Sequence, residues 1–267
     1  VEDSTFKVSR DVQTHELVVT GMSNLHLDVI LSRLKNRYEI EVESRQPKIP
    51  HKETITKKAN AQYKHKKQTG GKGQYGEVYL RIEPLERGGG FEFVSKIVGG
   101  AIPSQYIPAV EKGLKETIAK GILSNNPIVD VKVELYDGTF HNVDSSEAAF
   151  KIAASKAFNL AFNDAKPVLL EPVVNIEVTI PSEFMGDITG NLSSRRGRVQ
   201  GMDTFGDLQV LKASIPMDEV KNYETELKSM TGGRGSYTME LSHYDVVPSH
   251  LTQAIIAQAK KEAETVD

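Results

Sequence analysis

The stretch VVNIEVTI, residues 173–180, opens the clearest run of strand and helix signals in the chain. Hydrophobic periodicity is the main sequence signal for such elements. The elements expected after it are a helix at 183–194, strands at 199–202 and 208–215, a helix at 219–230 and a strand at 237–244. The order β-α-β-β-α-β predicts a ferredoxin-like split βαβ fold for residues 169–246.

Residues 53–168, which precede this unit, carry a second pattern. Their first part, 53–67, is polar and basic, and alternating apolar residues then indicate strands within 78–82, 91–97 and 129–135. Two helices are expected, one opening at Pro108 and one after Asp144, where the sequence DSSE has the spacing of a capping box. The residues expected to face the core are Val110, Leu114 and Ile118 on the first helix, and Ala149, Ile152, Ala153, Leu160 and Ala161 on the second.

The first 52 residues predict an incomplete unit. Strands are expected at 6–10 and 16–22, a helix capped by Ser23-Asn24, and a strand at 39–43. This order is three-quarters of a split βαβ sandwich and lacks the opening strand and helix. Because so small a sheet buries little apolar surface, we expect the chain to be a piece of a longer protein.

The predicted fold class is therefore α+β with several domains. Ferredoxin-like units at 169–246 and, truncated, at 1–52 flank a domain of strands and helices at 53–168, which the family resemblance given below implies to be of βαβ type. Residues 247–267 predict a terminal helix with the stripe Leu251, Ile255 and Ala259. A short helix of this kind must dock on another element to bury its apolar stripe.

Composition excludes several classes of protein. The chain has 267 residues, 39% of them hydrophobic and 26% charged, with a net charge of −3 and no cysteine. These values exclude a collagen-like or low-complexity chain, disulfides and cysteine-ligated zinc. The sequence lacks the run of roughly 18 apolar residues that a membrane span needs, and we expect no signal peptide.

Two segments imitate enzyme motifs. GKGQYGEV, residues 71–78, fits both the dinucleotide pattern G-x-G-x-x-G and the kinase glycine loop. A strand rather than a helix is expected after this segment, which excludes a dinucleotide-binding loop. The other kinase motifs are missing from the sequence, which excludes a protein kinase. DTFG, residues 203–206, reads as a turn between strands, because no phosphate-binding loop accompanies it. The seven histidines have no metal-ligand spacing, so we predict no catalytic residue and no metal site.

Charge is concentrated in one run. Between Lys57 and Arg81 there are seven cations and one carboxylate, Glu77. This segment has a net charge of +6, whereas the whole chain has a net charge of −3. Such local density favours a polyanion such as RNA, and Tyr63, Gln74 and Tyr75 could stack or hydrogen-bond there. The alternative is a solvated basic loop.

Three further loops are candidates for binding. In YDGTFHN, residues 136–142, Asp-Gly predicts a turn that exposes His141, although a lone surface histidine is as often without function. SSRRGR, residues 193–198, offers three guanidinium groups, which bind phosphate or pair with carboxylates of a neighbouring domain. TGGRG, residues 231–235, exposes Arg234 at a helix end.

These segments resemble elongation factor G. The matching motifs run in order along most of the chain: GM at 21–22 with LHL at 25–27, QTGGKGQYG at 68–76, IVGG at 97–100, YIPAV at 106–110, LYDG at 135–138, DSSE at 144–147, PVLLEP at 167–172, SRRGR at 194–198 and SHY at 242–244. The resemblance assigns 1–52 to part of domain III, 53–168 to domain IV, 169–246 to domain V and 247–267 to a helix that returns to domain IV.

The resemblance implies a ribosome-dependent GTPase that promotes translocation of tRNA and mRNA, of which this chain lacks the GTP-binding domain. GTP and magnesium would belong to the parent protein, and this chain would need no cofactor. Implied partners are the ribosome, with its rRNA and decoding-site tRNA–mRNA, and the absent GTPase domain; we expect a cytoplasmic monomer. The implied contact residues of the domain IV tip are Gly70, Gly71, Lys72, Gly73, Gln74, Tyr75, Gly76, Gly138, His141 and Asn142. Further rRNA contacts are expected at Lys64, Lys66, Lys67, Arg195, Arg196, Arg198 and Arg234.

Some residues depart from the family pattern. Lys72 stands where many members have Arg, and Glu77 stands where His is common. With the lysine-rich run, these departures suggest a divergent second paralogue. Alternative functions are ribosome recycling or ribosomal protection and, in another class, an autonomous phosphotransferase that uses the glycine-rich loop.

Overall fold

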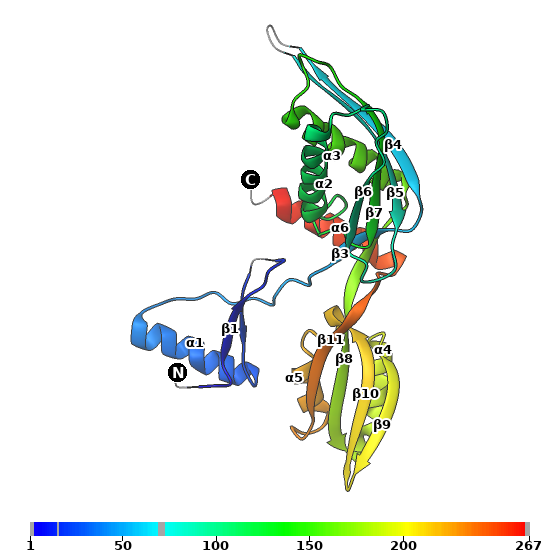
Figure 1. The fold of residues 1–267 in the computed structure, drawn as a ribbon. Helices are drawn as coiled ribbons and strands as arrows, with labels where there is room; N and C mark the ends of the chain where they lie inside the picture. The colour runs from blue at the N-terminus through cyan, green and yellow to red at the C-terminus, as the bar shows by residue number, and fades with distance from the viewer. Residues whose placement is uncertain (1–2, 15, 69–72, 265–267) are drawn as a thin grey trace. The chain divides into compact units, whose positions relative to one another are not determined.

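The computed structural model describes residues 3–14, 16–68 and 73–264 (Figure 1). The chain forms two compact units, one of residues 1–50 with 171–245, the other of residues 51–170 with 246–267. The second unit, which we call the hairpin unit, is thus built from two separate stretches of chain. None of the helices in the described part is long and apolar enough to cross a membrane.

Residues 171–245 form the ferredoxin-like part of the first unit. Strand β8 (Pro167–Pro181) enters it, and the remaining elements are α4 (Met185–Ser194), β9 (Arg198–Phe205), β10 (Leu208–Pro216), α5 (Tyr223–Met230) and β11 (Ser236–Val246), with short 3-10 turns at Ser182–Phe184 and Met217–Val220. The strands lie in the order β11-β8-β10-β9, and β10 is antiparallel to β8 and β9. The β-α-β-β-α-β prediction is confirmed.

Alternating residues explain this sheet. Ile176, Val178 and Ile180 on β8 are buried, as are Leu211 and Ile215 on β10. Since successive side chains of a strand point to opposite faces, each of these two strands presents one apolar row to the helices. The helices complete the core with Ile188, Leu192, Tyr223 and Leu227.

The hairpin unit contains a four-stranded sheet with two helices on one face (Figure 1). Its elements are β3 (Lys52–Ile55), β4 (Ala59–Lys67), β5 (Gln74–Pro84), β6 (Phe91–Ser95), a 3-10 turn (Ser104–Tyr106), α2 (Ile107–Lys120), β7 (Val131–Thr139), α3 (Glu147–Asp164) and α6 (Ser249–Glu264). The sheet order is β4-β5-β7-β6, with β6 parallel to β7 and the other pairs antiparallel. Strand β3 pairs with the first four residues of β8.

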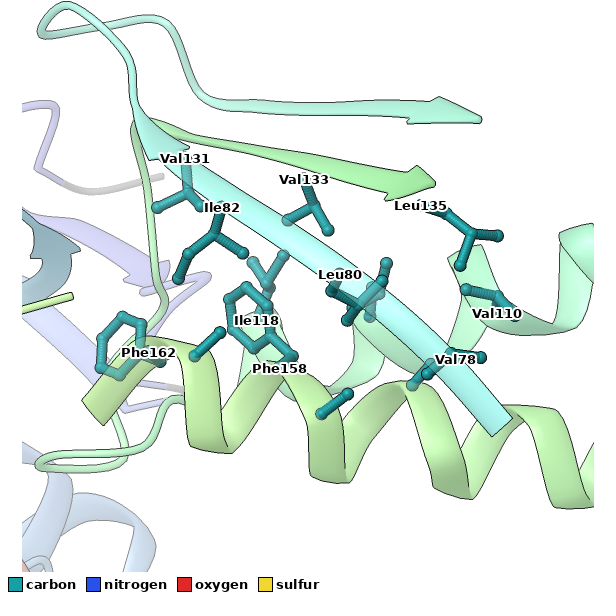
Figure 2. Close-up of a cluster of buried hydrophobic side chains, with 14 of the residues drawn as sticks. Val78, Leu80, Ile82, Val110, Ile118, Val131, Val133, Leu135, Phe158 and Phe162 are labelled. Carbon is teal, nitrogen blue, oxygen red and sulfur yellow. The ribbon is translucent and has the colours of Figure 1, made fainter. Parts of the chain in front are cut away.

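The buried face of helix α3 is only partly the one predicted: Ala149, Ala153 and Ala161 are buried as expected. Ile152 and Leu160 are exposed, whereas Phe150, Phe158 and Phe162 are fully buried. Figure 2 shows Phe158 and Phe162 in the cluster that also holds residues of β5 and β7. Phenylalanine removes more apolar area from water than any alanine in the helix, so the aromatic positions set its orientation. The alanines beside them allow the helix to approach the sheet closely. The predicted core residues of α2, Val110, Leu114 and Ile118, are buried as expected.

The predicted cap of α3 was also wrong. The N-cap is Ser146, whose side chain accepts a hydrogen bond from the Ala149 amide. Asp144 lies two residues earlier, where its Oδ1 accepts the amide hydrogen of Gly73 at 3.0 Å. Both residue types cap helices well, and Asp144 instead serves a segment 71 residues away in sequence.

The polar stretch 53–67 contains two strands that its sequence did not reveal. Glu53, in β3, is fully buried. Its Oε2 accepts the amides of Ile122 and Leu123 at 2.8 and 2.9 Å, and its Oε1 accepts the amides of Ser124 and Asn126 at 2.8 and 3.2 Å. The hydroxyl of Ser124 donates to the same Oε1 at 3.2 Å. A buried carboxylate is stable when hydrogen bonds satisfy it in this way, so Glu53 anchors the turn that follows α2.

Residues 3–50 are described on their own. Strands β1 (Lys7–Arg10) and β2 (Leu17–Thr20) form an antiparallel pair, and α1 (Asn24–Tyr38) is capped by Ser23 as predicted. The strand predicted at 39–43 does not form, and 39–51 has no regular structure. A strand needs a ladder partner, and the sheet in this described segment has only two strands. Helix α1 has no fully buried residue, so no core holds 39–43 in place either.

Candidate nucleic-acid interface

Residues 73–76 of the first predicted tip segment lie at the start of β5, at the end of the β4–β5 hairpin, where these strands run past α2 and α3 (Figure 1). Gly70, Gly71 and Lys72 fall outside the described residues. Gly73 is buried, and Gln74 begins β5 with an exposed side chain. The Oε1 of Gln74 lies 2.9 Å from Nε2 of His65, so the hairpin itself orients this amide.

The second predicted tip segment is partly a strand. Gly138 lies inside β7 opposite Val78, so the turn predicted at Asp137-Gly138 does not occur. A Cβ on Gly138 would lie 2.4 Å from Cδ1 of Ile102 and 2.5 Å from the carbonyl oxygen of Glu77. Gly138 is also buried, so its role is to allow close packing. The loop begins after Thr139 and carries His141 and Asn142, both exposed.

Hydrogen bonds join the two tip segments. The Tyr75 amide donates to the carbonyl oxygen of Asp144 at 2.9 Å, and the Ser145 hydroxyl donates to the carbonyl oxygen of Tyr75 at 3.0 Å. With the bond between Gly73 and Asp144, three hydrogen bonds connect residues 73–75 to residues 144–145. The two segments therefore form one surface, although about 70 residues separate them in sequence.

Gly76 lets the hairpin approach α3 closely. A Cβ at this position would lie 3.1 Å from backbone atoms of Ala149 and Phe150, in the first turn of the helix. Gly76 does not have a positive φ, so its importance comes from this contact rather than from a conformation that only glycine adopts.

His141 is oriented by its own loop. Its Nδ1 accepts the amides of Val143 and Asp144 at 3.3 and 3.2 Å, and its own amide donates to the Ser145 hydroxyl at 2.9 Å. A ring nitrogen that accepts hydrogen bonds carries no proton, so the neutral ring has its proton on Nε2. Oδ2 of Asp144 lies 3.3 Å from Nδ1. The side chain is 54% exposed, which leaves it accessible to a partner.

The lysines of β4 are only partly available for phosphate. Nζ of Lys64 lies 3.6 Å from Oε2 of Glu77, and this carboxylate raises the pKa of Lys64 above its ordinary value. Lys66 and Lys67 are exposed. Since β4 is the edge strand of its sheet, these lysines also oppose the addition of another strand, and that structural role stands beside the RNA role.

The arginines at the end of α4 are paired within the first unit. Arg196 donates to both oxygens of Glu171 at 2.6 and 3.1 Å and to Glu219 at 2.8 Å. Arg195 binds Glu226 and donates to the carbonyl oxygen of Glu219 at 2.7 Å. These contacts favour the carboxylate-pairing alternative for both residues, with partners in the same unit rather than in a neighbouring domain.

The other two predicted arginines differ from this pair. Arg234 binds Glu183 at 2.6 Å and lies over the ring of Phe184, but its side chain is mostly exposed. Arg198 is exposed and has no ion pair within the part of the chain that the structure describes. Within the same part, no group of three histidine, aspartate or glutamate residues could hold a metal ion.

Comparison with known proteins identifies the family. Family models match the chain in order, with elongation factor G domain III over residues 1–46, domain IV over residues 47–166 and the elongation factor G C-terminus over residues 168–255. The chain belongs to the elongation factor G family.

Two relatives show how much of the family the chain represents. It is 48% identical to elongation factor G of Aquifex pyrophilus over 257 residues, which are 96% of this chain and 37% of that protein. A crystal structure of a Thermus thermophilus protein is 46% identical, with a TM-score of 0.85, covering 97% of this chain and 39% of the other. The chain therefore spans less than two-fifths of these relatives. The resemblance stated from the motifs is confirmed, and so is the α+β class.

The sequence reasoning missed several residues of the candidate interface. Asp144 and Ser145 were assigned to a helix cap, Tyr75 was expected to stack or hydrogen-bond with a partner rather than within the fold, and the Thr139 hydroxyl was not considered. Glu77 was noted only as the one carboxylate of the basic run and as a departure from the family pattern, yet its side chain is almost buried. A cross-strand register between β4, β5 and β7 would have placed Lys64 and Thr139 opposite Glu77. That register could not be derived while β4 itself was unrecognised.

Proposed function

We propose that this chain is the ribosome-binding part of a translation factor that promotes the movement of tRNA and mRNA. The joined segments 73–76 and 141–145 would contact the codon–anticodon helix in the decoding site and hinder its return. The observation that carries this proposal is the exposed His141, held by three hydrogen bonds at the end of the hairpin.

The chemistry available at this surface is binding and positioning. Structured RNA is recognised by shape and by neutralisation of phosphate charge. Lys66 and Lys67 are exposed beside the tip and can supply that charge, whereas His141, Asn142 and Gln74 can hydrogen-bond to base edges and sugars. GTP hydrolysis would reside in a domain of the parent protein outside residues 1–267, together with its magnesium ion.

The test uses the full-length parent protein with purified ribosomes. His141→Ala and Gln74→Ala should slow single-turnover translocation, while ribosome binding and the unfolding transition stay unchanged. Asn163→Ala, at an exposed position near the end of α3, is the control and should translocate at the rate of the parent. Normal translocation in both tip variants would refute the decoding-site role, and impaired ribosome recycling alone would assign the tip to recycling instead.

A salt series tests the electrostatic part of the proposal. Binding of the 267-residue chain to ribosomes should weaken steeply as salt is added, because counterions return to the phosphates. Lys66→Ala should lower the slope of log affinity against log salt by about 1, as expected when one phosphate contact is lost. An unchanged slope would remove Lys66 from the interface.

A further inference from the structure

A polar network lies directly below the tip, on the face of the sheet opposite α2 and α3. At its centre is Glu77, whose side chain is only 9% exposed. The Thr139 hydroxyl donates to Oε2 of Glu77 at 2.6 Å, and the Tyr75 hydroxyl lies 2.6 Å from the Thr139 oxygen and 3.4 Å from the same Oε2. Nζ of Lys64 lies 3.6 Å from Oε2 and 5.8 Å from the centre of the Tyr75 ring.

This network joins three strands at one level of the sheet. In the register of the sheet, Glu77 of β5 stands opposite Lys64 of β4 and opposite Thr139 of β7. Directly opposite residues lie close enough for their side chains to interact, and here all three are polar. Thr139 is the last residue of β7, so the network ends the strand where the tip loop begins.

Tyr75 transmits the position of the network to the tip. Its side chain belongs to the network, and its backbone holds Asp144 and Ser145 through the bonds described above. Its ring centre is 6.2 Å from that of His141. A change in the direction of the Tyr75 ring therefore reaches both the ring of His141 and the loop that orients it.

The charge of Glu77 is what makes this arrangement specific. Thr139, Tyr75 and Lys64 all contact the same oxygen, Oε2, so a glutamine could keep an acceptor there but would lose the negative charge that attracts Lys64. Hydrogen bonds to an ionised acceptor are also stronger than those to a neutral one. Replacing Glu77 by glutamine would thus loosen Tyr75 without removing bulk from the sheet.

We infer that Glu77 is a positioning residue, which fixes Tyr75, and through it His141, in the direction that engages the codon–anticodon helix. The inference rests on the proposed function of the tip. It goes beyond that proposal by assigning the orientation of the tip to a carboxylate that itself touches no RNA.

The test compares E77Q with a matched control, E134Q. Glu134 lies in β7 on the same face of the sheet, its side chain is 8% exposed, and it pairs with Arg81 at 2.9 Å and with Lys96 at 2.5 Å. Both variants remove one nearly buried carboxylate charge. A general loss of sheet stability would affect both, whereas loss of tip position would affect only E77Q.

In the full-length parent, E77Q should lower the single-turnover translocation rate about tenfold, within the range that a displacement of ~1 Å costs a positioned group. The concentration of factor that gives half-maximal rate should stay unchanged, because the RNA-contacting residues are intact. In the 267-residue chain, the backbone amide NMR signals of Gln74 and Asp144 should shift in E77Q and not in E134Q. Thr139→Val should reproduce the effect, and Thr139→Ser, which keeps the hydroxyl, should restore most of the rate.

The outcomes separate this inference from the proposed function. If His141→Ala slows translocation but E77Q and Thr139→Val do not, the positioning role of Glu77 is refuted and the function of the tip stands. If His141→Ala and Gln74→Ala have no effect either, the proposed function fails as well. An equal loss of rate in E77Q and E134Q would show a structural role only.

Discussion

Replacing Glu53 by glutamine tests how much of the hairpin unit depends on one buried carboxylate. The substitution keeps the size of the side chain and removes its charge. Glutamine has one acceptor oxygen, which can serve the amides now bound to Oε1. Its amino group would face the amides of Ile122 and Leu123, which now donate to Oε2.

The magnitude follows from those two donors. A buried donor left without an acceptor costs about 1–3 kcal/mol, so two of them give a loss of about 2–6 kcal/mol. The remaining bonds to the neutral amide are also weaker than bonds to a carboxylate. Since domains are stable by only about 5–15 kcal/mol, this change is a large part of the total.

Hydrogen exchange of the 267-residue chain, followed by mass spectrometry, measures the effect in each unit separately. The protection factors of peptides from β5 and β7 should fall at least about 30-fold in Glu53→Gln. This follows from the lower bound of about 2 kcal/mol, because 1.4 kcal/mol corresponds to a factor of ten. Peptides from β8 beyond residue 172 and from β10 belong to the first unit and should keep their protection.

The control is Glu86→Gln, an exposed residue of the same unit. Surface substitutions of this kind change stability by no more than about 0.5 kcal/mol. If protection in Glu53→Gln falls by no more than in the control, the carboxylate does not anchor the turn at 122–126 and the reasoning is refuted.

Three further substitutions test other contacts. Gly76→Val should displace the hairpin from α3 and lower the unfolding temperature of the hairpin unit, and a crystal structure of the variant with unmoved residues 73–76 would contradict this. Arg196→Ala should destabilise the ferredoxin-like part by about 3–5 kcal/mol in urea unfolding, because it leaves the buried Glu171 unpaired; an unchanged transition with a lower salt slope of ribosome binding would instead show a phosphate contact. Burial raises the pKa of Tyr223 to about 12, so the folded state holds this proton more tightly than the unfolded state, and stability should fall as the pH rises from about 10 to about 12. Tyr223→Phe should remove that part of the pH dependence, which a series of unfolding curves would show, and retention of the full dependence would exclude Tyr223 as its source.

The ferredoxin-like part could be predicted from sequence because β8 and β10 alternate clearly and α4 and α5 each carry apolar residues on one side, although β9 is almost wholly exposed. Its alternating strands and spaced helices leave one arrangement that buries all the rows together. Helix α3 shows where that logic stops. It has apolar residues around most of its circumference, so periodicity did not distinguish Phe158 and Phe162 from Ile152 and Leu160, and only the packing of the large rings against the sheet decides.

The candidate site depends on contacts that sequence could not supply. Strand β4 is polar because it lies at a sheet edge with one face in solvent, and a strand of that composition gives little signal. Without β4 there is no register, and without register Lys64 and Glu77 are only two charges in a basic run. Asp144 was assigned to the nearest helix because local capping is common, whereas its partner Gly73 is close only in the folded chain.

The discontinuous hairpin unit has a consequence for the order of folding on the ribosome that synthesises it. The first part of this unit ends at residue 170, and the second begins at residue 246. The two parts meet at Val247, which is buried and whose amide donates to the carbonyl oxygen of Leu169. The 75 residues between them, 171–245, must be made first. At about 5–20 residues per second this takes ~4–15 s, ample time for a small domain to fold. Synthesis of the hairpin unit thus begins before that of the ferredoxin-like part and ends after it. The ferredoxin-like part can therefore fold before the hairpin unit has its final strand contact and helix α6.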